Sequence, residues 1–166
     1  GSMSGTIRSV QNYAVKIANK IKSALPNHDI KFGAIYYNDP VENPYDPKES
    51  HEYLDFTSNL TVFQYLIDNK ASYYGADVPE DWVGAYNIVL NNITWRNGTR
   101  AILHFADANA HGSDYNGYED YYDDEGKKMD KNVEKLCEMK NLFVRGFSIP
   151  RYGNDGARQS FNRMNN

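Results

Sequence analysis

The chain has 166 residues, enough to bury the core of one domain, and a net charge of −4. No basic patch stands out, which argues against nucleic acid as the main partner. No apolar run approaches the roughly 20 residues of a membrane span, and no signal-peptide pattern is present. The lone cysteine, Cys137, excludes an internal disulfide and favours an intracellular location. Three glycosylation sequons point instead to a secreted protein. They have no effect unless the protein is secreted.

Hydrophobic periodicity predicts the elements of the first half of the chain. They are a helix over 6–25, strands over 30–37 and 53–57, and a helix over 60–71. Pro26 ends the first helix. Its apolar positions recur at helical spacing, and the predicted inward residues are Ile7, Val10, Ala14, Ile17, Ile21 and Leu25.

The second half continues the alternation of helices and strands. The predicted elements are a helix over 79–93 with Pro79 at its first position, a strand over 101–106, a helix over 127–140, a strand over 142–149 and a helix over 157–164. Between the strand over 101–106 and the helix over 127–140, 108–126 is a long acidic, tyrosine-rich loop. Val133, Leu136 and Cys137 are predicted to face inward. The alternation indicates an α/β fold with a parallel sheet.

An apolar run over 101–106 ends abruptly at Asp107. This pattern is typical of the carboxyl end of a buried parallel strand, the edge at which open α/β sheets bind ligands. Asp107 is therefore the first candidate site residue. The alternative is that Asp107 only caps a turn or a helix.

A second acidic segment, 75–81, leads into a predicted helix. A hard cation takes several oxygen ligands from converging loops, and Asp77, Glu80 and Asp107 are suitable donors. The alternative is that Asp77 caps the helix and Glu80 lies solvated in its first turn.

Several motifs, taken in order, resemble a von Willebrand factor type A (vWA) domain. They are Asp55-Phe-Thr-Ser58, Gly75-Ala-Asp-Val-Pro-Glu-Asp81, Asn92-Ile-Thr-Trp-Arg96 and Phe105-Ala-Asp-Ala-Asn-Ala-His-Gly112. Phe32-Gly-Ala-Ile-Tyr-Tyr-Asn-Asp39 and Phe143-Val-Arg-Gly-Phe147 extend the similarity over nearly the whole chain. The chain is most similar to the branch found in large intracellular proteins, including some attached to alpha-type kinases.

The resemblance implies a single domain over 1–166 with a Rossmann-like, open, mostly parallel sheet and helices on both faces. It also implies Mg²⁺ or Mn²⁺ at the carboxyl edge of the sheet, in a metal-ion-dependent adhesion site. The ligand from the third loop corresponds to Asp107, and the ligand from the second is Glu80, which we prefer, or Asp77.

The start of the chain departs from the family pattern. The apolar first strand and the Asp of the first metal-binding motif are absent, and the chain opens at Gly1-Ser2-Met3. Either these residues are the end of that motif, with Ser2 as a metal ligand, or Gly1-Ser2 is an expression scar and the first loop is missing.

A missing central strand would leave two strand edges unpaired and an apolar slot between them. Three outcomes follow: the flanking strands close up, another chain fills the slot, or the domain is a truncated fragment. Filling by a second copy would give a strand-swapped homodimer. Loss of the acid would also weaken metal binding.

Three functions are consistent with these features. The first is a non-enzymatic domain that binds a protein ligand, whose carboxylate completes the coordination of the metal. The second is a metal-assisted hydrolase at the same edge, with His111 as acid or base. The third is a structural scaffold domain with a vestigial metal site. His104, within a strand, is expected to be a hydrogen-bonded core histidine.

Overall fold

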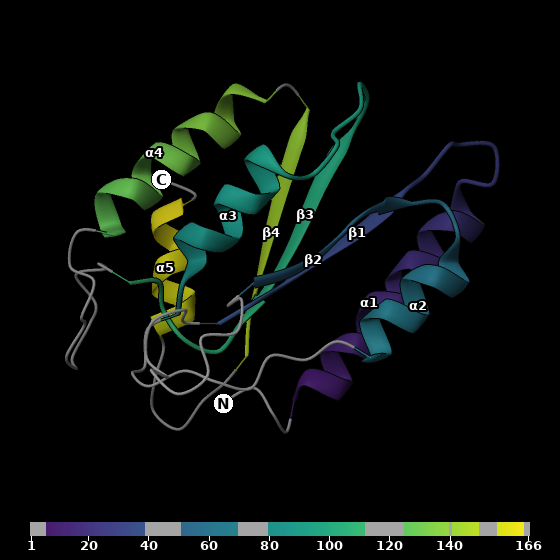
Figure 1. The fold of residues 1–166 in the computed structure, drawn as a ribbon, viewed down its shortest axis with the longest axis horizontal. Coiled ribbons are helices and arrows are strands. Elements are labelled where there is room, and N and C mark those ends of the chain that lie inside the picture. The colour runs from purple at the N-terminus through teal and green to yellow at the C-terminus, as the bar shows by residue number, and fades with distance from the viewer. Residues whose placement is uncertain are drawn as a thin grey trace.

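The computed structural model describes residues 6–38, 51–69, 80–111, 125–139, 141–149 and 156–164 (Figure 1). Its elements, in chain order, are α1 (Ile7–Ala24), β1 (Phe32–Tyr37), β2 (His51–Thr57), α2 (Leu60–Asn69), α3 (Trp82–Asn91), β3 (Arg100–Ala106), α4 (Glu125–Glu138), β4 (Leu142–Ser148) and α5 (Gly156–Met164). Helices and strands therefore follow the predicted order, and the mixed α/β class is confirmed. The predicted metal ligands Ser2 and Asp77 lie outside the described residues, as does nearly all of the acidic loop after His111.

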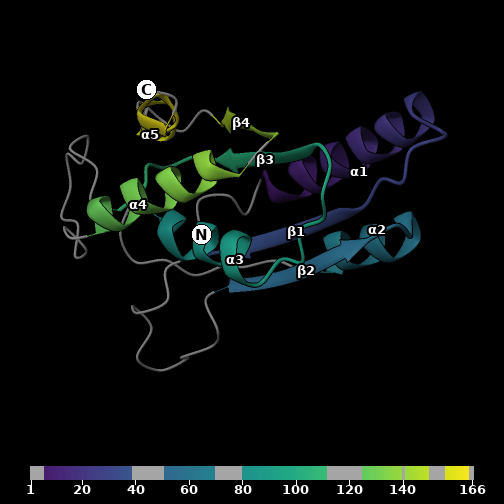
Figure 2. The same cartoon turned by 90° about the horizontal axis from the view of Figure 1, so that it is seen from above.

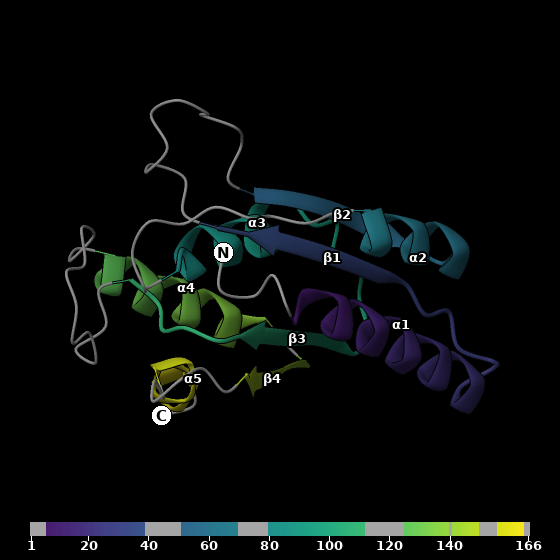
Figure 3. The same ribbon diagram turned by 90° about the horizontal axis from the view of Figure 1, so that it is seen from below.

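The strands form two separate pairs. β1 pairs with β2 in antiparallel orientation, whereas β3 and β4 are parallel. Figure 3 shows β1, β3 and β4 pointing the same way. Within the described residues, β1 and β3 share no ladder. The described strands thus form two short sheets, and the single mostly parallel sheet of the prediction is not confirmed.

The helices lie on two sides of the strands. α3, α4 and α5 lie on one side, and α1 and α2 on the other (Figures 1 and 2). The first group packs a core around Trp82, Tyr86, Leu136 and Phe161. The second group packs a smaller core around Val15, Ala18, Phe63 and Ile67. β1 contributes to both cores, because successive side chains of a strand point to opposite faces.

Two predictions of inward-facing residues are wrong. In α1 the buried residues are Gln11, Val15 and Ala18, while Ile21 and Leu25 are 36% and 43% exposed. The last turns of α1 extend beyond the ends of the described strands (Figure 3), so the residues of these turns do not lie over a strand. In α4, Cys137 is exposed, because it lies about 100° around the helix from the buried Leu136.

The start of α3 also differs from the prediction. The helix begins at Trp82 and not at Pro79, because the Asp81 carboxylate accepts a hydrogen bond from the Gly84 amide (2.7 Å) and acts as the N-cap. Trp82, Val83 and Tyr86 of this helix are buried. In the described part of the chain, no helix is long and apolar enough to cross a membrane.

Candidate functional site

Polar residues follow β3 and remain buried. Asp107, Asn109 and His111 are 5%, 2% and 3% exposed. The backbone of this segment is held from two sides. The Ile149 amide donates to the Ala106 carbonyl (2.8 Å), and the Ala110 amide donates to Ser160 Oγ (3.0 Å). The buried polar side chains are therefore fixed at the carboxyl end of β3, rather than lying on a solvated turn.

Glu80 lies beside this segment. Its amide donates to the Asn109 carbonyl (2.9 Å), its carbonyl accepts from the His111 amide (3.3 Å), and a parallel bridge joins it to Ala110. Glu80 and Asp107 line one cavity. The structure thus brings together two of the four predicted ligands, from segments 27 residues apart in the sequence.

Within the described residues, the side chains that could bind a divalent cation do not complete its coordination shell. No three His, Cys, Asp or Glu side chains among them lie together in a way that could hold a metal ion. The two carboxylates have the oxygen chemistry that Mg²⁺ and Mn²⁺ prefer, but a full coordination shell needs more oxygen atoms than they supply. Asp107 and Glu80 therefore fit part of a cation site.

A contact between His51 and Asp81 lies next to Glu80. His51 Nε2, at the start of β2, is 3.0 Å from Asp81 Oδ2, and both side chains are mostly buried. Burial alone would raise the pKa of the Asp81 carboxyl. The hydrogen bonds from His51 and from the Gly84 amide, together with the charges of His51 and His111, outweigh burial and hold this pKa below its ordinary value. Asp81 therefore stays ionised while it caps α3.

The sequence analysis did not identify His51 as part of this edge. Asp81 carries a recognisable signal, an acid directly before an apolar helix. His51 carries none, because its contact with Asp81 depends on how β2 is placed beside α3 and not on local pattern.

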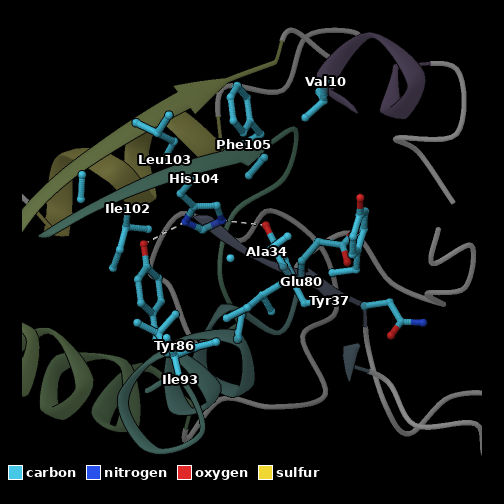
Figure 4. Close-up of a pocket in the computed structure, with 18 of the residues that line it drawn as sticks. Val10, Ala34, Tyr37, Glu80, Tyr86, Ile93, Ile102, Leu103, His104 and Phe105 are labelled. Atoms are coloured by element: carbon cyan, nitrogen blue, oxygen red, sulfur yellow. Dashed lines mark hydrogen bonds between the residues drawn. The ribbon is translucent and has the colours of Figure 1, made fainter. Parts of the chain in front are cut away.

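His104 is a hydrogen-bonded core histidine, as predicted. Its Nε2 lies 2.7 Å from Tyr37 Oη in β1, and its Nδ1 lies 2.9 Å from Tyr86 Oη in α3 (Figure 4). Burial lowers the pKa of His104 to about 3 and raises the pKa of Tyr86. The neutral imidazole therefore links β1, β3 and α3 without carrying a charge.

The cavity that contains Glu80 and Asp107 has a volume of about 280 Å³. It runs between β1 and β3, with α3 on one side and the first turns of α1, at Ile7 and Val10, on the other (Figure 4). The lining is mainly apolar, and polar groups gather at the carboxyl ends of the strands. One of them is Asn38, whose buried Oδ1 has no hydrogen-bond partner in the described part of the chain.

Comparisons with known proteins give one relative. No family model matches the chain. The sequence is 31% identical over 144 residues to a protein named alpha-protein kinase vwkA from Dictyostelium discoideum. The alignment covers 84% of this chain and 22% of the relative. The chain thus spans about a fifth of that protein's length.

Proposed function

We propose that this chain is a non-enzymatic protein-binding domain of the vWA type, with a divalent-cation site at the carboxyl edge of its strands. The observation that carries the proposal is the position of Glu80 and Asp107 on one cavity, with the Glu80 backbone bonded to the segment that follows Asp107. In the proposed fold, the two strand pairs are halves of one open, mostly parallel, Rossmann-like sheet.

The burial of Asp107 supports a cation at this edge. A carboxylate that is only 5% exposed is costly unless a charge or hydrogen bonds compensate it. Mg²⁺ or Mn²⁺ would supply that charge and would bind the Asp107 and Glu80 oxygens. Ser2 and Asp77 remain predicted as further oxygen ligands. A carboxylate of the protein partner would take a remaining coordination position.

The described residues favour binding over hydrolysis. The ring nitrogens of His104 both lie within hydrogen-bond distance of tyrosine hydroxyls, and Cys137 is on an exposed face of α4. His111, the acid or base of the hydrolase alternative, is 3% exposed. A scaffold domain with a vestigial site remains the alternative if no cation binds.

Calorimetric titration with Mg²⁺ and Mn²⁺ tests the proposal. We expect saturable binding by the native sequence, and loss of binding in Asp107→Ala because a carboxylate ligand is removed. The matched control is Asp68→Ala, which removes an acid on α2 that accepts a hydrogen bond from Gln64. It should bind as the native protein does. Absence of binding by the native protein, or equal binding by Asp107→Ala, would overturn the proposal.

A further inference from the structure

Asp81, the residue after Glu80, is held by two different parts of the fold. Its Oδ1 accepts a hydrogen bond from the Gly84 amide (2.7 Å), within the first turn of α3. Its Oδ2 lies 3.0 Å from Nε2 of His51, the first residue of β2. Both oxygens of this carboxylate are therefore engaged, one by α3 itself and one by a strand that comes much earlier in the chain.

Glu80 is held on its other side by the segment after β3. The Glu80 amide donates to the Asn109 carbonyl (2.9 Å), and the Glu80 carbonyl accepts from the His111 amide (3.3 Å). The backbone from Glu80 to Asp81 thus connects two anchors, a bridge to the segment after β3 and a contact with β2. A shift at either anchor would move the Glu80 carboxylate relative to Asp107.

The sequence leaves room for this contact at Gly84. A Cβ atom built on Gly84 would collide with Asp81 Oδ2 and would lie 2.7 Å from His51 Nε2. Glycine is the least favourable residue in a helix after proline, yet Gly84 lies in the first turn of α3. The space that the His51 and Asp81 side chains need explains why a glycine stands there.

Three elements supply donors or charge to Asp81. Burial acts to raise the pKa of the Asp81 carboxyl, but His51 of β2, the Gly84 amide of α3 and His111 after β3 hold this pKa below its ordinary value. An ionised carboxylate is a stronger acceptor than a neutral one. Asp81 is therefore the point at which β2, α3 and the segment after β3 are joined.

We propose that His51 is a positioning residue of the cation site. Through Asp81 it fixes the start of α3 against β2, and it thereby sets where the Glu80 carboxylate lies relative to Asp107. The inference rests on the proposed function, because it concerns the same site, but it assigns a role to a strand that supplies none of the predicted ligands. Altering residues that orient the ligands of a metal typically changes its affinity by about 10- to 100-fold.

Calorimetric titration with Mg²⁺ compares the native protein with three variants. His51→Ala should weaken binding by about tenfold or more, because the start of α3 loses its anchor on β2. His51→Gln should recover most of the affinity, because its side-chain amide can donate to Asp81 as the imidazole does. Gly84→Ala should also weaken binding, because the added methyl group displaces the His51 and Asp81 side chains while both remain present.

Asp55→Ala is the matched control. Asp55 lies towards the other end of β2 and accepts hydrogen bonds from the Thr94 amide (2.9 Å) and from Thr94 Oγ1 (2.6 Å), in the connection after α3. This variant also breaks a tie between β2 and the chain around α3, but at a distance from Glu80. It should bind Mg²⁺ as the native protein does. Equal weakening in Asp55→Ala and His51→Ala would indicate a general loss of stability and would overturn the positioning role.

Hydrogen exchange in the absence of metal gives a second readout. The amides of Glu80 and His111 form the bridge between the start of α3 and the segment after β3. In His51→Ala they should exchange about tenfold faster than in the native protein, because a contact with an ionised group no longer opposes local opening. His51→Gln should restore the native rates, and Asp55→Ala should leave them unchanged. Native rates in His51→Ala would contradict the inference.

Failure of the inference can be distinguished from failure of the proposed function. If the native protein binds Mg²⁺ and His51→Ala binds it with equal affinity, the inference is overturned and the proposed cation site stands. If the native protein binds neither Mg²⁺ nor Mn²⁺, the proposed function is overturned, and the role of His51 at a cation site is overturned with it.

Discussion

At the scale of single residues, His104 holds three elements together through uncharged hydrogen bonds. Its imidazole lies between Tyr37 of β1 and Tyr86 of α3, and its ring also packs against Trp82 and Phe161, with centroid distances of 4.3 and 4.9 Å. The side chain is 7% exposed. Protonation would place a charge among these rings and would disturb both hydrogen bonds.

This environment makes the stability of the protein depend on pH. The pKa of His104 falls from 6.5 to about 3 on folding, so between these values the unfolded chain binds the extra proton. The free energy of unfolding should therefore decrease as pH falls from about 6.5 towards 3. Urea denaturation at several pH values measures this decrease.

His104→Gln is the control, because glutamine retains hydrogen-bonding groups but does not titrate. The variant should be less stable at pH 7, and its stability should depend less on pH between 6.5 and 4. An unchanged pH profile in the variant would show that His104 does not carry the effect.

At the scale of elements, β4 and α5 approach so closely that a side chain at Gly146 would collide with α5. A Cβ atom built on Gly146 would lie 2.3 Å from Cδ1 of Phe161. The Phe161 ring cannot move away easily, because it is 7% exposed and stacks against Trp82 at 4.7 Å. Gly146 is thus required for the close packing of the last helix on the sheet.

Gly146→Ala should destabilise the protein by about 1–3 kcal/mol, the usual cost of overpacking a core. The melting temperature should drop by about 2–4 °C for each kcal/mol. In the double variant with Phe161→Leu, the smaller side chain leaves room for the new methyl group. The loss should then be smaller than the sum of the two single losses. A strictly additive loss would mean that Gly146 and Phe161 do not constrain one another.

Element order and approximate bounds could be predicted from the sequence, because each is set by local periodicity and stop signals. The run that ends at Asp107 is β3, and Pro26 follows α1 closely. The exposure of Ile21 could not be predicted, because it depends on where the neighbouring strands end. The same holds for the His51–Asp81 pair, which joins β2 to the start of α3.

At the scale of the whole molecule, the strands form two separate pairs, and a cavity lies between β1 and β3. Glu80 lies beside the segment that follows Asp107, at the carboxyl end of β3, and the role of both residues as cation ligands stays a prediction. Ser2 and Asp77 stay predictions, because they lie outside the described residues.

The central claim is that a cation is held between Glu80 and Asp107. Amide hydrogen exchange of the native protein, measured with and without saturating Mg²⁺, tests this claim most directly. The account predicts slower exchange at the amides of Glu80, Ala110 and His111, whose hydrogen bonds surround the site, and no change in α2, which lies on the other side of the strands. Unchanged exchange at these three amides, or equal slowing throughout the molecule, would contradict the account.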